Sequence, residues 1–208
     1  MQKTVQISFR KRIERLNSQG YTYIKLLMAQ LALYLVSFTV AIFSSRSAMA
    51  QLDTESLSGL LVHFSYVFSD CDGMYDLIST FVRYALPDIV QMMLIFVAGF
   101  TMFAGPVCAA VNLYRGASLG LGVGYFLYAG TSVPYFEISL LVFILINVLI
   151  SVLSIIFSVN SVLFSYEYRK SIGRRKALIQ YTVSFLIILG AAVALDLVRC
   201  IAGAVYTI

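Results

Sequence analysis

Long apolar runs separated by short polar segments are the feature that most restricts how this chain can fold. The run from Ile24 to Ser44 contains a single charged residue and is close to the ~20 residues that a helix needs to cross a bilayer. Similar runs recur along the chain. Only 12% of the 208 residues are charged and 60% are hydrophobic, whereas soluble domains are roughly 25% charged. The sequence therefore predicts an all-α, polytopic membrane helix bundle that forms one unit.

The distribution of basic residues predicts how this bundle is oriented. Five spans are expected, at residues 24–44, 88–111, 116–132, 138–158 and 177–195. Lys and Arg gather before the first run, in residues 1–25, and again in residues 169–176. Because Lys/Arg-rich flanks stay in the cytoplasm, the N-terminus is expected inside and the C-terminus outside. Residues 1–23 are predicted to form a basic amphipathic segment on the inner leaflet. Since these charges flank spans, nucleic acid is not an expected partner.

Residues 46–87 are predicted to lie outside the membrane as an acidic loop. Two stretches in it have helical spacing of apolar residues and predict short amphipathic helices on the outer face of the bundle. The string Asp70-Cys71-Asp72-Gly73 lacks the further ligands of a calcium loop and predicts a turn. Ala48 and Ala50 resemble a signal peptidase site, but the long basic and apolar regions before them favour an uncleaved anchor.

The boundary between the second and third spans depends on Arg115. Gly105-Pro106 could end or kink the second span. An arginine in mid-bilayer costs about 2.5–3.5 kcal/mol, so we expect the second span to end near Asn112 and Arg115 to lie at the inner interface.

Three glycines recur every four residues at the start of the third predicted span: Gly116, Gly120 and Gly124. On a helix they form a smooth stripe that lets another backbone approach closely. Packing within the chain is the favoured interpretation, and an interface between subunits is the alternative. No Lys-Ser/Thr pair follows the glycines, so a phosphate-binding loop is not expected.

Polar residues in the apolar runs are the candidate functional side chains. Asn112 and Asn147 each need a partner on another helix, and a transported substrate is the alternative partner. Asp196 and Arg199 are three residues apart and can pair at the outer edge of the last span. With His63 isolated and only three cysteines, no catalytic set, metal site or cofactor is expected.

The segment FAGPVCAAVNLYRGASLGLGVGYF resembles the core of the stage II sporulation protein M family, through Arg115, Gly116 and Gly120. Asn147 falls where sporulating members often have Pro-Gln-Asn. The basic loop matches in place, and Asp196 stands where the family usually has Glu. The chain departs from the family where Leu145-Ile146 replace Pro-Gln, and it lacks a histidine-glycine-acid signature found in many relatives.

This resemblance implies a non-enzymatic scaffold of the bacterial cytoplasmic membrane. Such a protein holds peptidoglycan-remodelling partners at the septal membrane during spore engulfment, and a second copy of the chain is another candidate partner. The alternative is the membrane subunit of a transporter, of the energy-coupling-factor or ABC type. In that case Asn112, Asn147 and Asp196 should converge around a pocket for a small substrate.

Overall fold

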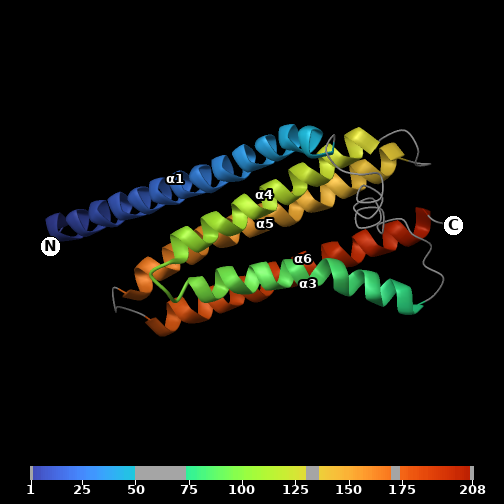
Figure 1. The fold of residues 1–208 in the computed structure, drawn as a ribbon. Helices are drawn as coiled ribbons and strands as arrows, with labels where there is room; N and C mark the ends of the chain where they lie inside the picture. The colour runs from blue at the N-terminus through green and yellow to red at the C-terminus, as the bar shows by residue number, and fades with distance from the viewer. Residues whose placement is uncertain (1, 50–73, 130–135, 170–173, 207–208) are drawn as a thin grey trace.

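The computed structural model describes residues 2–49, 74–129, 136–169 and 174–206, and nearly all of them are helical. Within these ranges the chain forms five long helices (Figure 1): α1 (Gln2–Met49), α3 (Met74–Ala98), α4 (Ala104–Ala129), α5 (Phe136–Arg169) and α6 (Arg174–Tyr206). The predicted all-α fold is confirmed for this part of the chain.

Four of these helices contain a segment long and apolar enough to cross a membrane: Tyr21–Ser45, Ile78–Ala98, Ile144–Tyr166 and Arg175–Ile201. Large apolar side chains on the outer surface, such as Phe43, Phe103 and Ile187, are more than half exposed. A surface of this kind is stable only against lipid, so the chain is a multi-pass membrane protein. The fifth helix, α4, has 26 residues and is not among these four segments.

The helices run side by side with alternating directions (Figure 1). α1, α4 and α6 run one way, and α3 and α5 run the other. α1 packs chiefly on α4, α3 chiefly on α6, and α5 contacts both groups. The short turn 99–103 returns the chain from α3 to α4, so α4 runs back along the bundle.

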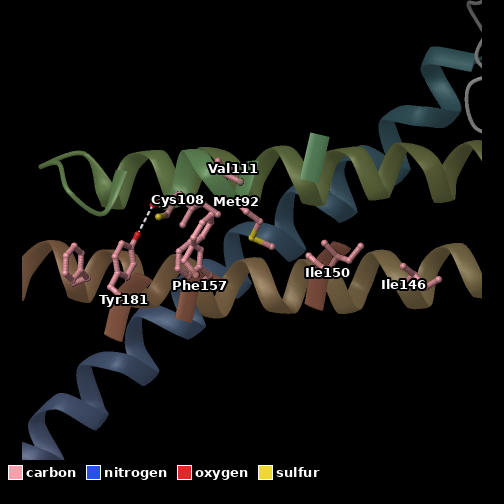
Figure 2. Close-up of a cluster of buried hydrophobic side chains, with 11 residues drawn as sticks. Met92, Cys108, Val111, Ile146, Ile150, Phe157 and Tyr181 are labelled. Atoms are coloured by element: carbon pink, nitrogen blue, oxygen red, sulfur yellow. Dashed lines mark hydrogen bonds between the residues drawn. The ribbon is translucent and has the colours of Figure 1, made fainter. Parts of the chain in front are cut away.

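The main apolar core lies between α3, α4, α5 and α6. Met92, Cys108 and Val111 belong to one buried cluster with the α5 side chains Phe157 and Ile150 (Figure 2). The ring of Tyr181 stacks on Phe157 and on Phe164, with centroids 5.5 and 4.1 Å apart. Such stacked rings supply more stabilisation than area alone.

Polar side chains of α5 and α6 contact the C-terminal end of α3. The Tyr181 hydroxyl donates to the Phe96 carbonyl at 3.0 Å, and the Ser161 hydroxyl donates to the Ile95 carbonyl at 2.8 Å. These side-chain bonds add donors to two carbonyls that otherwise share only the Gly99 N–H, at 3.2 Å each, at the end of the helix. A Cβ at Gly99 would lie 2.7 Å from the ring of Tyr181, so glycine is required there.

The helix boundaries differ from the predicted second and third spans, 88–111 and 116–132. α3 begins at Met74, inside the predicted external segment 46–87, and ends at Ala98, whereas α4 runs through Asn112 and Arg115 without a break. Two prolines explain part of the error. Pro87 is accommodated inside α3, and Pro106 lies in the first turn of α4, where a missing N–H breaks no helical bond.

The first helix also differs from its prediction. Residues 2–49 form one continuous helix with no proline inside it, so residues 2–23 of the predicted amphipathic segment are the first part of α1. α5 and α6 extend beyond the predicted spans 138–158 and 177–195. The predicted turn at 70–73 and the first of the two predicted loop helices lie outside the described residues.

Candidate functional site: buried charges inside the helix bundle

An ion pair joins α3 to α4 in the middle of the bundle. The Arg115 Nη2 atom donates to Asp88 Oδ1 at 2.6 Å, with side chains 6% and 16% exposed. Asp88 is ten residues from each end of the apolar window Ile78–Ala98, about 15 Å at 1.5 Å per residue. The pair therefore lies midway along this apolar window. The sequence predicts Arg115 at the inner interface; in the bundle its side chain lies against α3, where Asp88 offsets the cost of burying its charge.

Asp196 on α6 faces this pair from the third side. Its side chain is 0% exposed, and neither carboxylate oxygen has a hydrogen-bond partner. The carboxyl group interacts electrostatically with Asp88, Arg115 and Arg199, and it lies within hydrogen-bonding reach of the Asp88 carboxyl. Asp196 thus interacts with charged groups on α3 and α4 and with Arg199 on its own helix. An ionised carboxylate without any donor is among the most costly groups to bury.

Arg199 connects α6 to α3 in a different way. Its guanidinium carbon lies 4.0 Å from the centroid of the Tyr84 ring, and the side chain is buried. A cation over an aromatic face gains attraction, most of all where water is excluded. The sequence predicts that Arg199 pairs locally with Asp196; the structure places its guanidinium against Tyr84 on another helix, and the Asp196 oxygens accept no hydrogen bond. We call the following four side chains the charge cluster: Asp88, Arg115, Asp196 and Arg199.

A network of amides and hydroxyls lies beside the charge cluster. The fully buried Asn112 amide donates to Gln30 Oε1 on α1 at 2.8 Å and to Ser158 Oγ on α5 at 3.2 Å. The Ser154 hydroxyl in turn donates to the side-chain amide oxygen of Asn112, Oδ1, at 3.5 Å. The sequence predicts partners on other helices for Asn112, and α1 and α5 provide them. Asn112 and Arg115 are three residues apart on α4, which places the network next to the charges.

Asn147 takes a different place from Asn112. It is half-buried on α5, and its backbone carbonyl accepts a hydrogen bond from Ser151 Oγ at 2.7 Å. Of the three polar residues expected to converge, Asn112 lies in the amide network and Asp196 in the charge cluster. Asn147 belongs to the same helix as the serines described next.

Five buried serines on α5 are the feature that the sequence interpretation missed. They line the inner face of the helix: Ser151, Ser154, Ser158, Ser161 and Ser165. Their spacing alternates between three and four residues, as on one face of a helix. This spacing is visible in the sequence and would have identified a polar stripe through an otherwise apolar span. The stripe contacts Asn112 at its centre and the end of α3 at Ser161 and Ser165.

The predicted glycine stripe packs against α1. A Cβ at Gly116 would meet Ser37 and the Tyr34 carbonyl, and one at Gly120 would meet the Phe38 carbonyl and Ala41 Cβ. A Cβ at Gly124 would meet Ser45. Ser37, Ala41 and Ser45 are themselves small residues spaced by four, so both helices present a smooth face. The stripe is thus occupied within the chain.

The chemistry available to this site is that of carboxyl and guanidinium groups. Among the described residues, no three His, Cys, Asp or Glu side chains gather as metal ligands would. Comparison with protein-family models, with curated proteins and with solved structures finds no match for this chain. The fold and the site together define a multi-pass membrane protein with charged groups buried in its interior.

Proposed function

We propose that this chain moves a small charged solute across a membrane and that the charge cluster binds it. The observation that carries the proposal is Asp196, which is fully buried in an apolar helix with no hydrogen bond to either oxygen. Ionisable residues inside membrane helices mark substrate or ion pathways by default. Replacing a buried ion pair by apolar residues is often neutral or stabilising, so stability alone does not account for three buried charges and a partly buried fourth on three helices.

The proposed setting is the bacterial cytoplasmic membrane with the N-terminus inside. The basic residues before the first span and in 169–176 support this orientation. In this proposal α4 is a fifth span, since α3 and α5 run in the same direction and the chain between them must return. The C-terminus then lies outside.

Transport is tested on purified protein in proteoliposomes, with currents recorded on a solid-supported membrane during jumps in concentration of inorganic ions and small organic acids. We expect a current with the wild type that falls at least tenfold in Asp196→Asn. Glu137→Gln is the matched control, because Glu137 lies outside the apolar window Ile144–Tyr166. Equal currents in the wild type and Asp196→Asn would contradict a role for the cluster, and no current with any solute would contradict transport.

The scaffold is a second candidate, supported by the resemblance of residues 103–126 to the stage II sporulation protein M family. Since α1 occupies the glycine stripe, partners would have to bind elsewhere, and the external segment is the proposed docking site. Tagged protein isolated in mild detergent should then bring wall-remodelling enzymes with it. Replacing residues 50–73 by a Gly/Ser linker should abolish that association. Recovery of ATPase subunits in their place would favour the transporter.

A further inference from the structure

We propose that Asp196 binds a proton that it shares with Asp88, and that this proton crosses the membrane together with a small anion. The proton site stands on the complete burial of Asp196 and on its two carboxyl oxygens, which receive no donor. Its coupling to an anion rests on the transport function proposed above.

The contacts of Asp196 favour its neutral form. As a carboxylate it has two buried oxygens that receive no donor, although Arg115 and Arg199 are near. Arg115 is directed to Asp88 at 2.6 Å, and Arg199 is stacked on Tyr84 at 4.0 Å. As a carboxylic acid, Asp196 gains an O–H group that can donate to the Asp88 carboxylate within reach. One proton thus converts two repelling acceptors into a hydrogen-bonded pair.

The protonation step is simple in its chemical balance. A proton from water on one side of the membrane forms an O–H bond with a carboxylate oxygen of Asp196, and no other covalent bond changes. On the other side the same bond breaks and the proton returns to water. The charged groups that interact with Asp196 are Asp88 from α3, Arg115 from α4 and Arg199 from α6 itself. Tyr84 on α3 interacts in turn with Arg199 and Cys200.

The net charge of the cluster determines the sign of the solute that is transported with the proton. With both carboxyls ionised, two negative and two positive charges cancel. Protonation of Asp196 leaves one positive charge in excess within the membrane, which a bound anion neutralises. Proton and anion binding therefore favour one another, and each must raise the affinity for the other by the same factor. Guanidinium groups suit this role because they bind carboxylates and phosphates through several N–H donors.

The proton site is tested by infrared spectroscopy of the purified protein in lipid nanodiscs over a pH series. We expect the carbonyl band of a protonated carboxylic acid in the wild type, in Glu137→Gln and, shifted, in Asp196→Glu. Asp196→Asn should lack this band while eluting as the same monodisperse species. A band unchanged in Asp196→Asn, or no such band in the wild type at any pH where it stays folded, would overturn the proposal.

Coupling is tested separately with a pH-sensitive dye inside proteoliposomes. An inward gradient of chloride, inorganic phosphate or citrate should acidify the lumen in the wild type and in Glu137→Gln, and at least tenfold more slowly in Asp196→Asn. Solute currents without acidification would leave transport in place and refute proton coupling. The infrared band without any current or acidification would instead refute transport and leave the proton site standing.

Discussion

Substituting Gly120 by alanine tests whether the close contact of α1 with α4 stabilises this protein. The added Cβ would collide with the Phe38 carbonyl oxygen and lie 2.8 Å from Ala41 Cβ, whereas carbon atoms in contact normally lie about 3.5–4.0 Å apart. Because a backbone atom cannot rotate away, the two helices must separate by about 1 Å, which forfeits a quarter to a half of each dispersion contact along the stripe. Overpacking of this kind costs about 1–3 kcal/mol.

Gly190→Ala is the matched control for this experiment. Gly190 lies inside α6 with nothing within 4 Å of the methyl group that alanine would add, so the substitution gains only helix propensity, about 0.5–1 kcal/mol. Gly120→Ala receives the same gain, so the difference between the two variants isolates the packing loss. Unfolding in mixed micelles, followed by circular dichroism, measures both free energies. If Gly120→Ala unfolds with the same free energy as Gly190→Ala, close packing on α1 is refuted.

Three further substitutions test the contacts around the site. Gly124→Ala should destabilise the protein by about 1–3 kcal/mol, because the added Cβ collides with Ser45. Ser45→Gly in the same chain removes the colliding atoms and should restore most of the loss. A double variant no more stable than Gly124→Ala alone would contradict this geometry. Asp88→Asn and Arg115→Met should each cost about 3–5 kcal/mol by leaving a buried charge without its partner. Their combination should cost clearly less than the sum, and strict additivity in the same unfolding assay would argue against the ion pair. Tyr181→Phe should cost about 1 kcal/mol by removing the hydroxyl that donates to the end of α3, and an unchanged midpoint of thermal unfolding would argue against that hydrogen bond.

Apolar run length was sufficient to predict the helical class and most of the spans. The run beginning at Ile24 lies inside the window Tyr21–Ser45, and the runs predicted at 138–158 and 177–195 lie within α5 and α6. Each of these helices can be recognised from its own residues, because backbone groups in lipid must bond within the segment. The glycine spacing likewise predicted a close helix contact, but the identity of the opposing helix depends on tertiary packing.

Arg115 shows why the second and third spans were misplaced. The cost assigned to a charge in mid-bilayer assumes that the charge has no partner. Its partner Asp88 is 27 positions away and was assigned to the start of a span, so neither residue alone indicated the other. The same assumption placed the expected end of the second span near Asn112, whereas α3 ends at Ala98. A paired search for opposite charges among all the apolar runs would have predicted that the two residues meet inside the bundle.

The meeting of Asp196 with Asp88 depends on the axial stagger of two helices. Asp88 is at the centre of its apolar window, whereas Asp196 lies about eight residues, or about 12 Å, from the centre of the window Arg175–Ile201. If both windows were centred on the bilayer, the carboxyl groups would lie at different depths. They come within reach because α6 is offset along its axis relative to α3 by about 12 Å, a little more than two helical turns. The offset follows from packing, because Arg199 contacts the ring of Tyr84. Tyr84 lies four residues before Asp88 on α3, and Arg199 lies three residues after Asp196 on the antiparallel α6. Two contacts one turn apart on each helix therefore fix the same stagger, and they bring the two carboxyl groups together.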